Sequence, residues 1–492
     1  MPDATSTRAR RATARRARLA LAATAVALAV IAVTVLRGGP PPPALLPGAA
    51  RPPAGDPLAW TPERSADDAR RAVEGLAHVL YVKSPAGLVA SAERTASWRP
   101  LIDAAARASG QDASTLEAIV LLESAGRAEA QASPSLDGAV GLTQILAETG
   151  RNLLGLRVDV AASARLTRRI ARADARGRVR RAQRLRAARR RVDERFDPRK
   201  ALAATARYLG IARARLGRDD LAVASYHMGI GNLVQALSLY GVPRGIPYAQ
   251  LYFDSTPLRH EAAQQFLARL GDDSSTYLWR VEAAREVMRL LRDDRGELER
   301  RARLQTARNS AEVLLHPPDQ TEVFADAGAL KSAYDDGDLV ALPGAYLRAH
   351  GVAIDRGMGA LAAAVGADPA LYRGLRREAL ATLAYIGTQV RRISGARAPL
   401  RVTSTVRDER YQRALLASDP EATSGYSLHT TGYAFDVARD YASRTQALAF
   451  QFVLDRLTAL NLVAWVREPG AIHVTVAHDA QRLEEPMGVQ TG

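Results

Sequence analysis

The chain of 492 residues contains no cysteine, which excludes disulfides and thiolate metal sites. It also contains almost no lysine: the three lysines are Lys83, Lys200 and Lys331, and arginine supplies the remaining positive charge. The formal net charge of +16 favours polyanionic surroundings such as nucleic acid, anionic lipid or an acidic wall polymer. There is no internal repeat, and the length allows two or three domains, each with its own core.

One long uncharged run is present, at residues 19–36, and six arginines precede it. As a helix these residues would extend ~27 Å, just enough for the ~30 Å hydrocarbon core of a membrane. Because arginine clusters stay on the cytoplasmic side, we expect residues 1–18 to form a basic cytoplasmic tail and residues 19–36 a single-pass anchor in the inner membrane. The bulk of the chain would then lie in the periplasm or cell-wall space. A cleaved signal peptide is the alternative, although Arg37, and not a small-residue cleavage site, closes the run.

The rest of the chain divides by composition. Proline is dense between residues 40 and 55, which predicts a stiff, extended linker over residues 37–60. Alanine, leucine and arginine recur at helical spacing over residues 61–273, which predicts a mainly α domain. We expect a charged helical connector at residues 274–338. Short β-type runs between helices predict an α+β domain at residues 339–492.

An arginine-dense segment near residues 163–192 lies inside the helical domain and contains the run RRAQRLRAARRR. One interpretation is a solvated, extended helix inserted into the domain. The other is an arm that binds a glycan or an anion. The segment does not indicate a specific nucleic-acid binder, because the chain has a predicted export signal and shows no binding module with interleaved aromatic residues.

The segment STLEAIVLLESAGR, residues 114–127, predicts a helix with a carboxyl group on its apolar face. Ser114 followed by Glu117 is a capping-box signature for the helix start. Glu123 shares a helix face with three apolar residues, Leu116, Ile119 and Val120. Burial raises the pKa of a carboxyl group, as a general acid near neutral pH requires. A partly solvated glutamate at the helix end, without a chemical role, is the alternative.

Three segments in this order carry a resemblance to a known family. They are the pair Glu123-Ser124, GAVGLTQI at residues 138–145 and LAVASYHMGIGNL at residues 221–233. Between residues 95 and 285 the chain resembles the lytic transglycosylases related to goose-type lysozyme, so a lysozyme-like fold is expected. The resemblance implies that Glu123 is the single catalytic acid/base. It also implies that the glycan is bound by Ser124, Thr143, Gln144 and Tyr226, the last of them near the carboxyl group.

The chain departs from the pattern of this family at several positions. Thr143 stands where methionine is usual, and Ser225 and His227 flank Tyr226 in place of alanine and asparagine. The stretch between the acid and GLTQ is longer than usual, and the arginine-dense segment is additional. These differences affect the shape of the groove and leave the acid in place.

One carboxyl group suffices for the reaction that the resemblance implies, whereas ordinary glycosidases use two. Protonated Glu123 would donate to the leaving glycosidic oxygen. The carboxylate would then take the proton of the sugar's own 6-hydroxyl group, which closes a 1,6-anhydro ring. Asp137 lies in the same part of the sequence and would be the second carboxylate of a hydrolase, an alternative that the sequence leaves open.

Near the C-terminus, SLHTTGYAFDV at residues 427–437 and AIHVTV at residues 471–476 each contain a predicted strand. Alternation places Asp436 and His473 on the polar faces of these strands, and His429 in a loop before the first strand. Two imidazoles and one carboxylate, with a fourth position open to water, form a catalytic zinc arrangement. A hydrogen-bonded histidine–aspartate pair without a metal is the alternative.

The spacing Ser-x-His-x-x-Gly-x-Ala-x-Asp, followed by a strand with a central histidine, resembles zinc D-alanyl-D-alanine carboxypeptidases and endopeptidases between residues 345 and 480. The upstream run LRVTSTVRDERYQ fits the same family. The resemblance implies Zn²⁺ as the cofactor, with the ligands His429, Asp436 and His473. It also implies that Arg407 binds the scissile carbonyl or the substrate carboxylate, that Gln412 supports Arg407, and that Ser427 contacts the substrate.

The general base departs from this second family pattern. The family has a glutamate three residues before the last histidine, where this chain has Gly470. Glu468, two residues earlier, is the candidate base. A domain that binds peptidoglycan stems without cleaving them is the alternative.

Together these patterns predict a multidomain, membrane-anchored periplasmic peptidoglycan hydrolase. A lytic transglycosylase site would cut glycan strands, and a Zn²⁺ site would cut stem peptides. The expected partners are peptidoglycan and the inner membrane, with no specific nucleic acid. The alternative is a peptidoglycan-binding scaffold of an envelope machine with a degenerate peptidase site.

Overall fold

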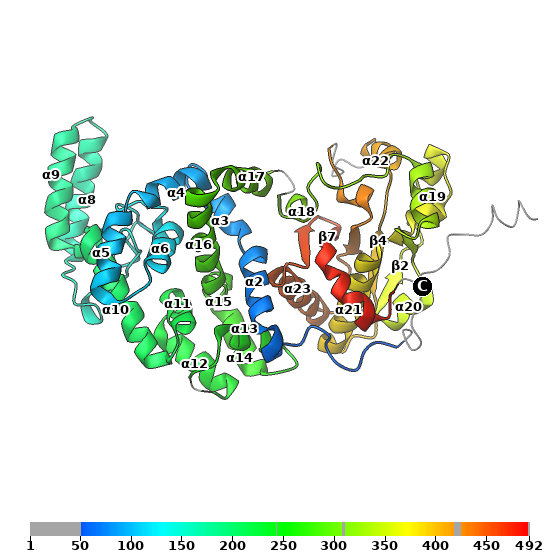
Figure 1. Cartoon of the computed structure of the whole chain (residues 1–492), viewed down its shortest axis with the longest axis horizontal. Coiled ribbons are helices and arrows are strands. Elements are labelled where there is room, and N and C mark those ends of the chain that lie inside the picture. The colour runs from blue at the N-terminus through cyan, green and yellow to red at the C-terminus, as the bar shows by residue number, and fades with distance from the viewer. Residues whose placement is uncertain (1–50, 243, 308–309, 418–424, 491–492) are drawn as a thin grey trace, which may run out of the picture.

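The computed structural model describes residues 51–242, 244–307, 310–417 and 425–490. The predicted cytoplasmic tail, the predicted membrane anchor and the first part of the predicted linker lie outside these ranges. Within them, none of the helices is both long and apolar enough to span a membrane. The chain is mainly helical, with a small sheet region in its C-terminal part. The sheet lies toward one end of an elongated molecule, and the helices of the N-terminal part form the other end (Figure 1).

The N-terminal unit, which comprises residues 61–305, is a bundle of packed helices. Aspartates begin several of them; the Asp197 side chain, for example, accepts hydrogen bonds from two backbone amides at the start of α10. The helices are α2 (Ser65–Gly75), α3 (His78–Lys83), α4 (Leu88–Ala96), α5 (Arg99–Ser109), α6 (Ala113–Ser124), α7 (Ala147–Asn152), α8 (Val160–Asp174), α9 (Val179–Val192), α10 (Pro198–Leu216), α11 (Asp219–Met228), α12 (Ile230–Tyr240), α13 (Tyr248–Asp254), α14 (Glu261–Arg269), α15 (Asp272–Ser275), α16 (Tyr277–Asp293) and α17 (Arg295–Gln305), with the 3-10 turns η1 (Pro62–Arg64) and η2 (Glu194–Phe196).

The start of α6 differs from the prediction. Asp112, and not Ser114, is the N-cap, and its carboxylate accepts hydrogen bonds from two backbone amides. Glu117 is buried and forms ion pairs with Arg99 at 3.0 Å and with Arg292 at 2.8 Å. The capping-box prediction is therefore wrong, because the earlier aspartate takes the cap and two arginines from other helices pair with Glu117.

The predicted connector at residues 274–338 is not a separate element. Helix α16 is packed into the N-terminal unit, where Trp279 and Met288 are buried. Helix α19 (Ala327–Asp335) packs within the C-terminal part of the chain, and α18 (Ser310–Leu315) contacts both α17 and the strands β6 and β7. The charged composition of the segment suggested exposure, but the charges share these helices with apolar residues that are buried.

The C-terminal unit, residues 310–490, is built on a five-stranded sheet in the order β2-β4-β5-β7-β6. Strands β2 and β4 are parallel, and the other neighbours are antiparallel. The strands of this sheet are β2 (Val352–Ile354), β4 (Leu400–Ser404), β5 (Ala434–Ala438), β6 (Val463–Arg467) and β7 (Ala471–Val476), and β1 (Val340–Ala341) and β3 (Gly374–Leu375) form a separate antiparallel pair. Besides α18 and α19, the helices are α20 (Gly344–Ala349), α21 (Arg377–Ser394), α22 (Glu409–Leu416), α23 (Arg444–Ala459) and α24 (Glu484–Met487), with the 3-10 turns η3 (Ala362–Val365), η4 (Pro369–Tyr372), η5 (Leu428–Thr431) and η6 (His478–Leu483).

The two strands that the sequence predicts are present as β5 and β7. Their register also agrees with the predicted alternation. Asp436 lies opposite His473, and Phe435 lies opposite Val474, so polar residues share one face of the sheet and apolar residues the other. Helices α21 and α23 pack against each other and against the sheet, whose apolar residues are buried (Figure 1).

The two units pack tightly against each other. Arg456 of α23 donates hydrogen bonds to the backbone oxygens of Leu58 and Phe253, at 2.7 and 3.1 Å. Gly75, at the end of α2, lies against the C-terminal unit so closely that a Cβ atom there would be 2.0 Å from the Thr458 backbone oxygen. Buried apolar residues of both units belong to one continuous core. The units therefore form one packed body.

The arginine-dense segment forms a helical hairpin of α8 and α9, which projects from the far end of the N-terminal unit (Figure 1). The prediction of one extended helix is corrected to two antiparallel helices. The turn between them contains Gly177 in a left-handed conformation, with φ of 63°.

Candidate functional site

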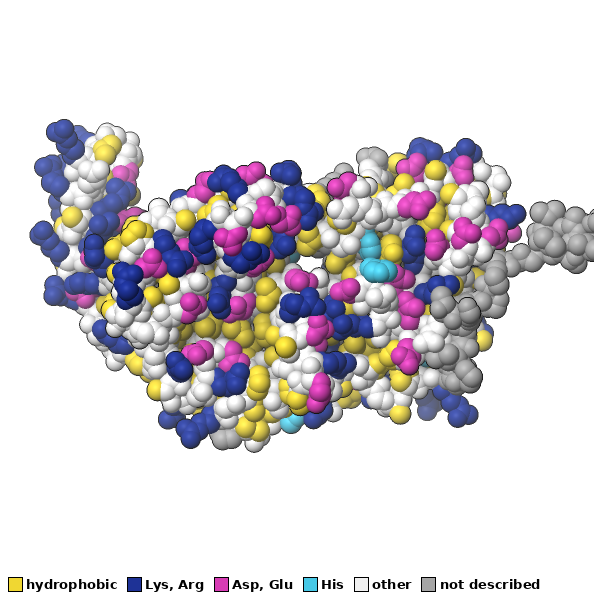
Figure 2. All heavy atoms as spheres, in the orientation of Figure 1, with side chains coloured by type: hydrophobic (Ala, Val, Ile, Leu, Met, Phe, Trp, Pro, Cys, Tyr) yellow, Lys and Arg dark blue, Asp and Glu magenta, His cyan; other side chains and the backbone are white. Residues whose placement is uncertain are grey.

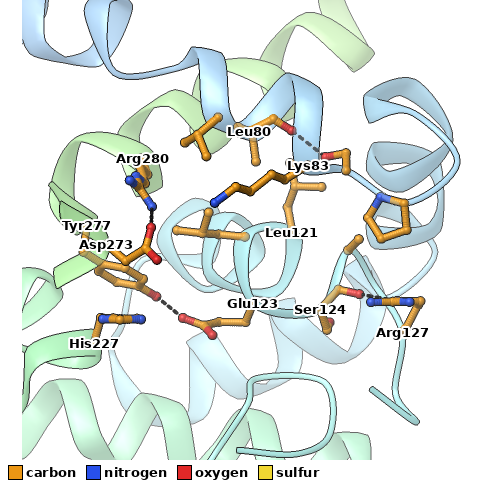
Figure 3. Close-up of a pocket in the computed structure, with 15 residues that line it drawn as sticks. Leu80, Lys83, Leu121, Glu123, Ser124, Arg127, His227, Asp273, Tyr277 and Arg280 are labelled. Carbon is orange, nitrogen blue, oxygen red and sulfur yellow. Dashed lines mark hydrogen bonds and ion pairs between the residues drawn. The ribbon is translucent and has the colours of Figure 1, made fainter. Parts of the chain in front are cut away.

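Glu123 lies in the last turn of α6, with its carboxyl group directed toward Tyr277 at the start of α16 (Figure 3). The Tyr277 hydroxyl group donates a hydrogen bond of 2.6 Å to Glu123 Oε1. Burial raises the pKa of Glu123 to about 7, although the hydrogen bond from Tyr277 acts to lower it. The carboxyl group is therefore still partly protonated at neutral pH, as a general acid requires.

Glu123 lines a cavity of about 290 Å³ between α6, α16 and α3. Other charged residues line it as well, namely Lys83, Arg127, Asp273 and Arg280. Figure 3 shows Asp273 and Arg280 paired beside Tyr277, on the side of the cavity away from Ser124. The cavity thus combines one carboxyl group of raised pKa with polar groups that could bind a hydroxylated substrate.

A second cavity, of about 380 Å³, adjoins the first, because His227 lines both. Gln144 and Tyr226, which the sequence assigns to the groove, line the second cavity. The two cavities therefore meet at His227, with Glu123 in the first and Gln144 in the second.

A tyrosine cluster holds Tyr277 in place. The rings of Tyr226 and Tyr277 are stacked, with 6.2 Å between their centroids and 18° between their planes. The Tyr226 hydroxyl group donates a hydrogen bond of 2.7 Å to the backbone oxygen of Thr143. Burial raises the pKa of both phenols, and the nearby Glu123 carboxylate raises both further. Both tyrosines therefore remain neutral hydrogen-bond donors.

The other residues assigned to glycan binding occupy different positions. Ser124 lines the first cavity with Glu123, but it is buried and its hydroxyl group donates a hydrogen bond of 2.7 Å to the Leu142 backbone oxygen, which fixes the GLTQ loop. Thr143 is fully buried, which corrects the prediction that its side chain lines the groove. Gln144 is half-buried with a φ of 51°, and it remains at the groove. The loop turns Thr143 inward and Gln144 outward, which the linear pattern does not reveal.

Sequence reasoning missed Tyr277 and Asp273. Tyr277 is 154 residues from Glu123 in the chain, so no local motif links the two. The hydrogen bond from Arg280 keeps the pKa of Asp273 below its usual value. Asp137, the predicted candidate for a second carboxylate, is exposed, accepts a hydrogen bond from Ser135 and lines neither cavity.

In the C-terminal unit, His429, Asp436 and His473 form one buried cluster that could hold a metal ion. Their potential ligand atoms all lie within 4.8 Å of one another. Asp436 Oδ1 is 3.2 Å from His429 Nε2 and 2.8 Å from His473 Nδ1. Ligands at ~2.0–2.2 Å from a tetrahedral ion lie roughly 3.3 Å apart, so the three side chains fit a metal with small adjustments.

Strand register and one turn create this cluster. Because β5 and β7 pair with Asp436 opposite His473, these two side chains emerge on the same face. His429 comes from η5, just before β5, and its Nδ1 lies 2.7 Å from the Thr405 backbone oxygen. A backbone oxygen only accepts hydrogen bonds, so Nδ1 carries the proton and Nε2 keeps a lone pair for a metal.

The charges of the cluster suit a cation. Burial, and then the Arg407 guanidinium, lower the pKa of His429 to about 4, so this imidazole is neutral at neutral pH. Burial opposes a charge on Asp436, but His429 and His473 hold its pKa well below the usual value. Burial also opposes a charge on His473, but Asp436 raises the pKa of His473 overall. His473 must lose its proton to ligate a metal, so binding weakens as pH falls.

Arg407 lies beside the cluster. Its guanidinium donates hydrogen bonds to Asp436 Oδ2 at 3.2 Å and to Gln412 Oε1 at 3.0 Å. Ser404 Oγ accepts two more. The predicted contact between Gln412 and Arg407 is therefore present, while the role of Arg407 toward a substrate stays a prediction. Ser427 is buried at the start of η5, and its predicted contact with substrate also stays a prediction.

Two glutamates lie near His473. Glu468 precedes the turn Pro469-Gly470, and its backbone amide donates to the Ala471 oxygen at 3.0 Å, which places it on the same face of the hairpin as His473. Glu312 of α18, which sequence reasoning missed, is buried, with its Oε1 3.6 Å from His473 Nε2. In the part of the chain that the structure describes, this oxygen has no hydrogen-bond partner. Carboxylates in such positions orient metal-ligating histidines.

Neither a family model nor a curated protein matches the chain. Functional interpretation therefore rests on the geometry of the two sites and on the resemblance of their motifs.

Proposed function

We propose that Glu123 is the acid/base of a lytic transglycosylase that cleaves peptidoglycan glycan strands. The observation that supports this most is the Glu123 carboxyl group itself, whose pKa is raised to about 7 at the wall of the first cavity. The motif resemblance around Glu123, Gln144 and Tyr226 supports the choice of a glycan as the substrate. A lysozyme-like fold for the N-terminal unit is part of this proposal.

In this reaction Glu123 acts first as an acid and then as a base. Tyr277 stays neutral and donates to Oε1, so the acidic proton is carried by Oε2. That proton passes to the glycosidic oxygen as the bond to the anomeric carbon breaks. The 6-hydroxyl oxygen of the same sugar then bonds to the anomeric carbon, and its proton returns to Glu123. No water is consumed, and one carboxyl group serves both transfers.

Asp273 supports a second candidate, a hydrolase. Its carboxylate lines the same cavity as Glu123, and its hydrogen bond from Arg280 favours the ionised form. It could therefore serve as the second carboxylate of an ordinary glycosidase. The candidates differ in their products, because a hydrolase leaves reducing ends and a transglycosylase leaves 1,6-anhydro ends.

Mass spectrometry of products from purified peptidoglycan tests both candidates. The wild-type protein should release anhydro-ended fragments, and Glu123→Gln should lower their release by about 10²–10⁴-fold, because the amide has no acidic proton. Glu148→Gln, at an exposed position on α7, is the matched control and should retain full activity. Undiminished release by Glu123→Gln would reject Glu123 as the acid. Reducing ends that disappear in Asp273→Asn would favour the hydrolase.

We also propose that the C-terminal unit is a zinc peptidase acting on stem peptides. His429, Asp436 and His473 would be the ligands, since two nitrogens and one oxygen within 4.8 Å suit Zn²⁺. When bound, zinc would polarise a carbonyl group and lower the pKa of a water molecule. Arg407 would hold the substrate's carbonyl or carboxylate group. Glu468 is the better candidate for the general base that accepts the proton of the attacking water. Glu312 is only 3% exposed and therefore less accessible to that water.

Metal analysis and chelation test the peptidase. The full-length protein, purified without a metal-affinity tag, should contain about one zinc ion per chain. A chelator should abolish the release of stem-peptide fragments from peptidoglycan and leave the anhydro-ended glycan products unchanged. Binding to peptidoglycan without soluble peptide products would instead support the scaffold alternative.

The proposed location follows from the predicted anchor and from the net charge of +16, both of which suit a membrane-attached protein beside anionic polymers. Protease treatment of spheroplasts is the test. Residues after the predicted anchor should be digested, and the predicted cytoplasmic tail should be protected. Full protection of the chain would contradict the location.

A further inference from the structure

The arm, which is the hairpin of α8 and α9 at residues 160–192, carries charge that neither proposed site uses. Its inner faces form a small apolar cluster of their own, with Ile170, Ala173, Ala182 and Leu185. Ten of its arginines are exposed: Arg165, Arg168, Arg169, Arg172, Arg176, Arg178, Arg180, Arg181, Arg184 and Arg191. Among the described residues, none of these ten forms an ion pair, whereas Arg186, Arg189 and Arg190 do.

The unpaired arginines form stripes along the arm. Four of them share one face of α8, namely Arg165, Arg168, Arg169 and Arg172, and Arg176 follows in the turn after the helix; these five form the α8 stripe. On α9 a similar face carries Arg180, Arg184 and Arg191. The first and last arginines of the α9 stripe are eleven positions apart, or ~16 Å at ~1.5 Å per residue. Figure 2 shows dark-blue Lys and Arg side chains along the length of the projecting arm.

The root of the arm is fixed to the loop that carries Gln144. Arg189 is buried, pairs with Glu129 and lies over the Phe196 ring, 3.6 Å from its centroid. Arg195 is also buried and donates hydrogen bonds to three backbone oxygens of that loop region, those of Leu136, Gly138 and Ile145. These contacts hold the arm in one direction relative to the groove.

We infer that the arm binds a flexible, linear polyanion with phosphate or carboxylate groups at regular intervals, such as a poly(glycerol phosphate) chain. The charge of the stripes is complementary to such a polymer, and a flexible chain can follow stripes on both helices, whereas a flat membrane can lie against one side. The arm has no aromatic residue, so it offers no stacking platform for single-stranded nucleic acid.

Two observations argue against a lipid surface. Val179 is the one large apolar side chain exposed on the arm, which gives no apolar face to insert among lipids. The arm also lies at the opposite end of the molecule from residue 51, where the described chain begins beside the C-terminal unit (Figure 1). The inference does not depend on catalysis at either proposed site.

Fluorescence anisotropy with labelled poly(glycerol phosphate) and the full-length protein tests the inference. If about five phosphates are contacted, affinity should fall on the order of 10²-fold between about 50 and 200 mM salt. Replacing the five arginines of the α8 stripe by glutamine should weaken binding at the lower salt by about tenfold or more and reduce its salt dependence. The matched variant, with lysine at the same five positions, keeps the charge and should bind within about threefold of wild type.

Thermal unfolding controls for folding, because these five side chains form no ion pairs in the described chain and both variants should melt close to wild type. Undiminished binding by the folded glutamine variant would overturn the inference. Tighter binding of the wild type to duplex DNA or to anionic phospholipid vesicles, at matched phosphate concentration, would also overturn it. Neutral dextran should not bind.

Discussion

The two candidate sites are built in opposite ways. In the metal cluster, strand register places Asp436 opposite His473, and His429 precedes Asp436 by seven residues. At the other site, Glu123 has its raised pKa through burial and accepts a hydrogen bond from Tyr277, 154 residues away. Ligand geometry is thus a local property of neighbouring strands, whereas a shifted pKa is a property of how distant helices pack.

The largest effect is expected from removing the central ligand. Asp436→Asn replaces a carboxylate that lies within 3.2 Å of both histidines, so zinc should fall from about one ion per chain to under about 0.1, measured by plasma mass spectrometry. The matched control is Asp440→Asn, whose side chain is 80% exposed and should leave the zinc content unchanged. Full zinc content in Asp436→Asn would show that the metal binds elsewhere.

The next largest effect is expected at Glu312, which tests whether a residue outside the strands of the metal cluster contributes to zinc affinity. Glu312→Gln should lower zinc affinity by about 10–100-fold, because the buried carboxylate next to His473 Nε2 orients that ligand. Competition with a chelating dye measures the affinity. Glu322→Gln, an exposed glutamate in the same stretch, is the control. An unchanged affinity in Glu312→Gln would confine the site to the three ligands.

The pH dependence of glycan cleavage should separate the two sites. The protonated form of Glu123 is the active one, and its pKa is raised to about 7, so the rate should be retained below that pH and fall about tenfold per unit above it. A carboxyl group of ordinary pKa would be less than about 1% protonated at pH 7. This fall, the alkaline limb of the pH–rate profile, is measured as the rate of release of anhydro ends between about pH 5 and 9 with chelator present. A limb near pH 4 to 5 would contradict the burial of Glu123.

The smallest effect concerns the long-range contact itself. Tyr277→Phe removes a hydrogen bond that lowers the pKa of Glu123, so the alkaline limb should move to higher pH. Tyr208→Phe is the control, because Tyr208 belongs to the same cluster but donates to the Ser225 backbone oxygen. Each variant should lose about 1 kcal/mol of unfolding free energy in denaturant titrations. Equal shifts of the limb in both would show that Tyr277 has no specific effect on Glu123.

The metal cluster was predictable because polar and apolar residues alternate visibly along the sequence of each strand. The runs YAFDV and AIHVTV gave the strands and the faces of Asp436 and His473 correctly. Strand β6, whose Val463–Arg467 segment pairs with β7, was not predicted, since its short apolar run also suits the end of the preceding helix. Glu312 was missed because its position depends on how α18 packs against β6 and β7.

The surroundings of Glu123 were less predictable. Helical spacing indicated the apolar face of α6, but Tyr277 and Asp273 come from the other side of the groove and share no motif with Glu123. Thr143 was assigned to the groove because the linear pattern does not show that the loop turns it inward. Helix α16 was interpreted as part of a connector because the sequence shows its many charges but does not show which of its faces is buried.

The close contact between the two units at Gly75, the seam, affects how the two proposed reactions would be coordinated. Any larger residue there would collide with the Thr458 backbone, and Arg456 joins the same seam to the start of the described chain. The interval between the carboxyl group and the metal ligands is therefore a built-in dimension of the fold. On a polymer that reaches both places, the glycan bond and the stem peptide cut in one encounter would lie a fixed distance apart.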